Sequence, residues 1–180
     1  MTENSVPLTG TVRMRVLRRS DAGRLADAYL RNREHLAPWE PTRSDEFFTV
    51  DGQAASIESK LGLFVAGSDV PWVLVEGARV VGVMNLSGIV RGPFLSGHLG
   101  YWVDKEMTGR GIGSAAVEFA VEAARTELGL HRLQAATLPQ NAASQRILKR
   151  TRFEEIGRAA AYLKIAGSWQ DHVLFQRILY

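Results

Sequence analysis

The sequence predicts a single mixed α/β (α+β) domain, in which a mostly antiparallel, twisted sheet of about seven strands carries helices on both faces. Three observations point to this fold class. Short apolar runs are separated by tight glycine turns, as in hairpins. Amphipathic helical patterns lie between those runs. Hydrophobic residues make up 46% of the 180 residues, enough for one proper core. We expect residues 11–180 to form this domain and residues 1–10 to be a flexible tail.

The first elements are predicted from alternation and breakers. Residues 12–17 alternate apolar and basic side chains, the pattern of a half-buried strand. Ser20 is placed to cap a helix that runs to about residue 32, with apolar residues at helical spacing. Two prolines in residues 36–41 (LAPWEP) end that helical region. A second helix is expected at residues 53–62.

A hairpin meander follows in the middle of the chain. Residues 70–75 and 79–86 are rich in valine and predict two strands, joined by the turn Glu76-Gly77-Ala78. The pair Gly92-Pro93 marks the next turn. Residues 98–103 (HLGYWV) then predict a third strand of the meander.

The last elements alternate between helices and strands. Residues 111–128 carry an apolar stripe at helical spacing, with charged residues on the opposite side. Residues 131–138 predict a strand, and Asn141 is placed to cap a short helix to about residue 150. Residues 153–165 and 169–178 predict a closing hairpin around Ala166-Gly167-Ser168.

Composition excludes several classes of protein. The chain has no cysteine, so disulfides, thiol nucleophiles and zinc thiolate sites are absent, and no metal site is expected. No apolar run approaches the length needed to span a membrane, and the first residues lack the layout of a signal peptide. The net charge of +3 is scattered along the chain, which does not indicate nucleic-acid binding. We therefore expect a cytoplasmic protein.

The most informative segment predicts an anion site. The strand at 98–103 leads into glycines that alternate with other residues and open an amphipathic helix. Free amides at a helix N-terminus, together with the helix dipole, favour a phosphate, and glycine lets the ligand approach closely. The segment is Thr108, Gly109, Arg110, Gly111, Ile112, Gly113 and Ser114.

Three kinds of phosphate loop, besides a plain glycine turn, could account for this segment. The dinucleotide fingerprint needs a third glycine where Ser114 stands, and it needs a βαβ unit in place of the hairpin strands found here. A Walker loop needs a lysine followed by serine or threonine, which is missing. A coenzyme A pyrophosphate loop needs only backbone donors and a helix start, and this one is favoured.

Two motifs resemble the GNAT superfamily of N-acetyltransferases. The acetyl-CoA loop of that family reads Gln/Arg-x-x-Gly-x-Gly/Ala, and residues 108–113 match it, except that Thr108 stands in the first place. The family element N-x-x-S…G-F is similar to Asn141-x-x-Ser144 with Phe153, where Arg152 replaces the glycine. The resemblance covers roughly the last half of the chain.

Further segments resemble one branch of that superfamily, the Rim-type ribosomal-protein-alanine N-acetyltransferases. Residues 32–41 (NREHLAPWEP) are similar to the N-R-x-x-L-x-P-W element of that branch. Residues 100–104 and 169–172 look like it as well. The resemblance implies acetyl-CoA as co-substrate and an acceptor-binding role for Asn32, Trp39 and Glu40, although core packing is as good an interpretation of Trp39.

The resemblance also implies how the thioester end is held. The strand edge at Tyr101, Trp102 and Val103 would pair with the pantetheine arm, although packing is the favoured role of the Trp102 side chain. Asn141 would bind the same arm, act as a helix N-cap, or do both. Ser144 would lie near the sulfur and protonate the leaving thiolate.

The general base is the weak point of the resemblance. Rim-type enzymes often place a glutamate on the penultimate strand, where this chain has Ala161. Tyr162, His172 and Glu40 remain candidates, as does a water chain to solvent.

The predicted function is direct acetyl transfer, in a ternary complex, from acetyl-CoA to the N-terminal α-amine of a protein. Two alternatives stay open: an acetyltransferase for small amines such as antibiotics or polyamines, and a non-catalytic acyl-CoA sensor. A monomer or a homodimer is expected, without nucleic-acid or membrane partners.

Overall fold

The computed structural model describes residues 5–180 and contains one eight-stranded sheet, with strand order β1-β2-β3-β4-β5-β6-β8-β7. Neighbouring strands are antiparallel except for β5 and β6, which are parallel. The mostly antiparallel, mixed α/β prediction is confirmed. The strands are β1 (Val6–Thr9), β2 (Val12–Val16), β3 (Val70–Glu76), β4 (Arg79–Val90), β5 (Ser96–Val103), β6 (Arg132–Thr137), β7 (Glu154–Ile165) and β8 (Ser168–Ile178).

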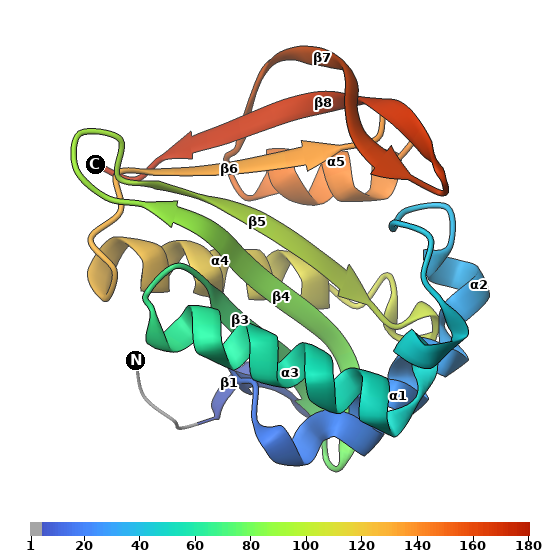
Figure 1. Ribbon diagram of the computed structural model, residues 1–180. Helices are drawn as coiled ribbons and strands as arrows, with labels where there is room; N and C mark the ends of the chain where they lie inside the picture. Colours follow the sequence, from blue (N-terminus) through green and yellow to red (C-terminus); the bar gives the residue numbers. More distant parts are fainter. Residues whose placement is uncertain (1–4) are drawn as a thin grey trace.

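Helices cover both faces of the sheet, as Figure 1 shows. Helices α1 and α3 pack on one face, and α4 and α5 pack on the other. The helices are α1 (Ala22–Arg31), α2 (Arg33–Leu36), α3 (Val50–Val65), α4 (Ile112–Thr126) and α5 (Ala142–Arg150), with single 3₁₀ turns at Arg19–Asp21, Asp45–Phe48 and Lys105–Met107.

The eighth strand corrects the expected N-terminal tail. Residues 6–9 pair with β2 as strand β1, and the turn at Gly10, whose φ is +55°, joins the two strands. Leu8 packs against the main core, which gives this short edge strand an apolar anchor. Residues 1–4 of the expected tail lie outside the described residues.

Two helix starts also differ from the sequence prediction. Ser20 does not cap α1, because it lies inside a 3₁₀ turn and α1 begins after Asp21. The buried Asp21 carboxylate instead pairs with Arg15 at 2.6 Å and accepts a hydrogen bond from the Arg18 amide. Helix α3 is longer than predicted because Thr49 caps it, accepting a bond from Gly52 N at 3.0 Å.

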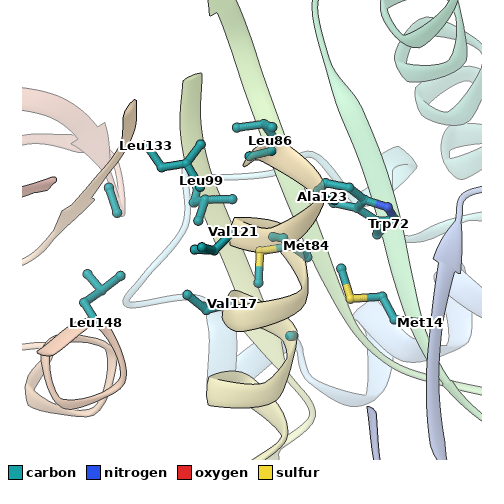
Figure 2. Close-up of a cluster of buried hydrophobic side chains, with 14 of the residues drawn as sticks. Met14, Trp72, Met84, Leu86, Leu99, Val117, Val121, Ala123, Leu133 and Leu148 are labelled. Atoms are coloured by element: carbon teal, nitrogen blue, oxygen red, sulfur yellow. The ribbon is translucent and has the colours of Figure 1, made fainter. Parts of the chain in front are cut away.

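The larger core lies between the sheet and α4. Figure 2 shows Val117 and Val121 of α4 reaching side chains of the sheet, among them Met84, Leu86 and Leu99. Leu148 of α5 belongs to the same cluster. This packing fixes where α4 begins relative to the end of β5, and so positions the glycine loop between them.

Among residues 5–180, no helix is long and apolar enough to cross a membrane. The same residues contain no group of three or more His, Asp or Glu side chains that could hold a metal ion.

Candidate functional site

Strands β5 and β6 pair along only part of their length. The ladder joins Ser96–Leu99 to Arg132–Ala135 and then stops, while β5 continues to Val103 and β6 to Thr137. In Figure 1 the two strands diverge beyond this point. Unpaired backbone groups in a sheet interior need other partners. Residues 100–103 of β5 therefore offer a free strand edge inside the sheet.

The hydrogen-bond alternation decides which residues face this gap. Asp104 N donates to Val81 O at 2.9 Å, and the register pairs Trp102 with Val83. Because hydrogen-bonded pairs alternate in an antiparallel ladder, the backbone of Trp102 points to β4. The backbone groups of Tyr101 and Val103 point into the gap.

Trp102, predicted as a cofactor contact, does not face the gap. Its backbone is turned toward β4, and its side chain is only 7% exposed on the face covered by α1. The indole packs against Tyr29, with ring centroids 5.1 Å apart. Core packing is the role that the structure supports for this tryptophan.

Gly109 and Gly111 have the properties expected of a phosphate loop. Their φ angles are +76° and +77°, in the left-handed region that favours glycine. A Cβ added at either position would meet nothing within 4 Å, so the space beside them is open. The chain can hold this conformation and leave room for a ligand.

Helix α4 presents its N-terminus to that open space. Its first internal bond runs from Ala115 N to Gly111 O at 3.0 Å. The amides of Ile112, Gly113 and Ser114 therefore have no acceptor within the helix. The exposed Arg110 adds a positive charge beside them. This arrangement suits a polyanion.

Side chains of the remaining loop residues serve the fold. A Cβ on Gly113 would lie 2.8 Å from Ile147 Cδ1, so this glycine lets α4 approach α5. Ile112 is buried in the core. Thr108 Oγ1 donates to Lys105 O at 3.0 Å and closes the turn before the loop. At Ile112 and Gly113, only the backbone is available to a ligand.

The N-terminus of α5 lies across the gap from β5. Asn141 Oδ1 accepts a bond from Ser144 N at 3.1 Å, which confirms its predicted role as a helix N-cap. The Tyr101 hydroxyl lies 3.0 Å from Ser144 Oγ. Burial raises the pKa of Tyr101 to about 12, against the opposing effect of its bond to Ser144. Sequence reasoning missed this contact, since no local signal joins residues 43 positions apart.

Asn32, predicted as an acceptor-binding residue, is engaged in structural hydrogen bonds. It is fully buried, and both ends of its amide have partners. Asn32 Nδ2 donates to Ala28 O, and Asn32 Oδ1 accepts from Lys105 N, each at 2.9 Å. The residue anchors the segment that leads into the glycine loop.

A cavity of about 290 Å³ lies on the α1 side of the sheet. Its wall includes Glu40, but Trp39 is not among its lining residues. The lining residues are Tyr29, Arg33, Leu36, Ala37, Glu40, Pro41, Thr42, Arg43, Phe48 and Ala166. Ala166 N, in the turn between β7 and β8, donates to Glu40 O at 3.0 Å. The closing hairpin thus holds one side of this cavity in place.

Glu40 supplies a carboxylate to this cavity. Burial raises the pKa of Glu40, and the charges of Arg43 and Lys60 oppose that effect. Arg43 Nε lies 3.9 Å from Glu40 Oε2, too far for a close ion pair. Tyr29 lines this cavity and also contacts Trp102 of β5. The cavity is therefore one side chain away from the strand that borders the gap.

Tyr162 and His172 lie side by side on β7 and β8, outside this cavity lining. Their ring centroids are 5.6 Å apart, and His172 is only 3% exposed. His172 Nδ1 lies 3.0 Å from the Gln170 carbonyl oxygen, which occupies one ring nitrogen. This setting supports a packing role for His172.

A bulge occupies the position where the Rim-type glutamate is expected. Ala161 has φ +47°, and the register between β7 and β8 shifts around it. Its amide donates to Asp171 Oδ1 at 2.9 Å. Sequence reasoning did not consider this carboxylate. Asp171 lies within the motif at 169–172, which was the signal that could have pointed to it.

Comparisons with known proteins agree with this geometry. The family model described as an acetyltransferase (GNAT) domain matches residues 11–154. The chain is 35% identical over 163 residues to the [ribosomal protein uS5]-alanine N-acetyltransferase of Escherichia coli (strain K12), covering 89% of this chain and 84% of that protein.

Two solved structures are similar over almost the whole chain. The ribosomal-protein-S5-alanine acetyltransferase from Vibrio fischeri has a TM-score of 0.92 at 36% identity, covering 97% of this chain and 96% of that one. Mycobacterium smegmatis RimJ in complex with CoA-disulfide has a TM-score of 0.91 at 28% identity, covering 97% and 85%.

Proposed function

The chain belongs to the GNAT acetyltransferase family, and from this premise we propose that it transfers the acetyl group of acetyl-CoA to the N-terminal α-amine of a protein. The observation that carries the proposal is the free edge of β5, which leads directly into an open glycine loop at the N-terminus of α4. A donor with a pyrophosphate at one end and amides along its arm matches both features.

Each part of this site has its own task. The amides of residues 109–114 would hold the pyrophosphate. The backbone groups of Tyr101 and Val103 would pair with the pantetheine amides in the manner of a missing strand. Acetyl-CoA supplies an activated thioester. The protein would contribute mainly by holding the acceptor amine in line with that thioester.

The size of the cavity at Glu40 favours a small acceptor group. Its volume of about 290 Å³ lies at the lower end of the range for sites that enclose drug-sized ligands. The first residue of a peptide suits this space better than a multi-ring antibiotic. Relatives named for their action on an alanine of ribosomal protein uS5 point to the same class of acceptor.

The Glu40 carboxylate would attract the acceptor amine and receive a proton from it. The amine must lose its proton before it attacks the thioester carbonyl. The raised pKa of Glu40 makes this carboxylate a better proton acceptor than an exposed one. The proposed site of action is the cytoplasm, where ribosomal proteins are made. The oligomeric state, monomer or homodimer, stays a prediction.

Turnover with matched peptides tests the proposal. A short peptide with an N-terminal alanine is compared with the same peptide carrying a blocked N-terminus and one internal lysine. We expect thiol release from acetyl-CoA only with the free N-terminus, with mass spectrometry locating the acetyl group on the α-amine. Turnover confined to polyamines or aminoglycosides would favour the small-amine alternative. Tight acetyl-CoA binding without turnover on either class would favour the sensor.

A further inference from the structure

The hydroxyl groups of Tyr101 and Ser144 form a bridge across the gap. They lie 3.0 Å apart, one on the free half of β5 and the other in the first turn of α5. Both side chains are half-buried. A ligand that enters the gap along β5 would meet this hydroxyl pair.

The position of the pair in the gap indicates which end of a ligand it meets. The glycine loop lies beyond the C-terminal end of β5, and the gap closes at Leu99, where the ladder with β6 begins. A ligand anchored at the loop by its phosphates runs along β5 from Val103 toward Tyr101. Its far end, which carries the sulfur of CoA, reaches the hydroxyl pair.

The bonding pattern around Ser144 limits how its hydroxyl can point. A serine hydroxyl has one hydrogen to donate and two lone pairs that accept. The backbone amide of Ser144 is bound to Asn141 Oδ1, which fixes the first turn of α5. The Tyr101 hydroxyl stays protonated at neutral pH because burial raises its pKa to about 12. Tyr101 can donate to Ser144 Oγ at 3.0 Å, a nearer acceptor than the Ser144 carbonyl oxygen at 3.5 Å.

We propose that Tyr101 is a positioning residue whose O–H donates to Ser144 Oγ, so that the hydrogen of the serine hydroxyl points into the gap toward the sulfur of coenzyme A. This inference rests on the proposed function, since it gives the pair a task in thioester cleavage. It adds a role for a side chain whose backbone alone was assigned to cofactor binding.

The chemistry needs no net proton transfer from either hydroxyl. The amine nitrogen forms a bond to the carbonyl carbon, and the C–S bond breaks with its electron pair left on sulfur. The Ser144 O–H donates a hydrogen bond to this developing thiolate. The proton lost by the amine goes to the carboxylate or to solvent, and the free thiolate takes its proton from water. Tyr101 keeps its own proton throughout.

The first test changes the leaving group. Tyr101→Phe keeps the ring and removes the hydroxyl. With acetyl-CoA we expect kcat to fall at least tenfold while the KM for acetyl-CoA changes less than threefold. The selenoester analogue of acetyl-CoA leaves as a weaker base that needs less help. With this analogue the loss should shrink to less than threefold, whereas an equal loss with both donors would overturn the proposal.

A double-mutant cycle separates positioning from direct contact with sulfur. If Tyr101 acts through Ser144, then Tyr101→Phe should cause no further loss in a Ser144→Ala background. A full additional loss there would overturn the positioning role. Tyr180→Phe is the matched control, because its hydroxyl donates to Gly129 O, outside the gap, and it should leave kcat unchanged.

A binding measurement keeps this inference separate from the acceptor assignment. The pKa of the CoA thiol bound to the protein is followed by the ultraviolet absorbance of its thiolate. The wild type should lower this pKa, and Tyr101→Phe should raise it toward the value of free CoA. If the wild type shows this effect without turning over peptide, the proposed function fails while the bridge stands. An equal thiol pKa in the wild type and Tyr101→Phe would overturn the bridge.

Discussion

At the residue scale, three alternating glycines that look alike in sequence have different tasks. Gly109 and Gly111 allow left-handed backbone beside open space, whereas Gly113 makes room for Ile147 of α5. Sequence reasoning identified the loop, because its spacing and the helix that follows are local signals. The separate role of Gly113 depends on Ile147, a side chain from another helix, so a local sequence pattern could not predict it.

Gly111 is the position where a side chain should harm acetyl-CoA binding most directly. Gly111→Asn tolerates a left-handed φ and fills the open space. We expect acetyl-CoA affinity to fall at least tenfold, about 1.4 kcal/mol, with the melting temperature nearly unchanged. Calorimetric titration measures this. Gly10→Asn, at another left-handed and open glycine far from the loop, should bind acetyl-CoA normally. Normal affinity in Gly111→Asn would reject the loop assignment.

Glu40 is tested by how the rate depends on the acceptor. If Ala161 leaves the enzyme without a strong base, log kcat/KM should rise with slope one up to the pKa of the amine, and its midpoint should shift with each amine used. If Glu40 takes the proton, the low-pH limb of log kcat/KM in the wild type should have the same midpoint for every amine. Glu40→Gln should then remove this limb. Glu34→Gln, at an exposed glutamate of α2, is the control. A profile of Glu40→Gln that matches the wild type excludes Glu40 as the base.

At the element scale, most helices and strands could be predicted because their patterns are local. The alternation in β2, the valine-rich hairpin of β3 and β4, and the Asn141 cap of α5 were all confirmed. Strand β1 was missed because its four residues gain stability from distant partners, through pairing with β2 and the packing of Leu8 on the core. The gap between β5 and β6 could not be predicted, since the length of a parallel ladder depends on how α4 and α5 pack.

Asn32 shows how one buried amide links several elements. Asn32→Ala leaves the Lys105 amide without its partner. We expect the free energy of unfolding to fall by roughly 1–3 kcal/mol, and the KM for acetyl-CoA to rise because the segment before the glycine loop loses its anchor. Chemical denaturation and steady-state kinetics measure both. A raised peptide KM with unchanged stability would return Asn32 to the acceptor site, as the sequence had suggested.

At the scale of the whole molecule, a buried carboxylate joins α1 to the central strands. Asp104 is fully buried and pairs with Arg31 at 2.8 Å and Arg79 at 3.0 Å. Burial alone would raise the pKa of Asp104. Hydrogen bonds from the Glu106 amide, Asn32, Arg31 and Arg79 outweigh that effect and hold the pKa at about 2.

This depressed pKa predicts a loss of stability in acid. A carboxyl group with a pKa near 3.9 in the unfolded chain and about 2 in the fold contributes its stability above pH 4. That contribution, roughly 2–3 kcal/mol, should disappear as the pH falls from about 4 to about 2. Denaturant titrations at stepped pH values measure it. Asp104→Asn should be less stable at neutral pH and should have a flatter profile over this interval.

Because the ladder between β5 and β6 is interrupted, the backbone groups of β5 that face the gap obtain strand-like partners only when a ligand binds there. In hydrogen–deuterium exchange, the amides of Gly100 and Trp102 should exchange slowly at all times, because they face β4. Those of Tyr101 and Val103 should exchange quickly in the empty protein and slowly once CoA is added. The exchange rates of Tyr101 and Val103 would then report cofactor occupancy, with those of Gly100 and Trp102 as unchanging references on the same strand. Equal exchange at Tyr101 and Val103 with and without CoA would show that no ligand completes the sheet at this edge.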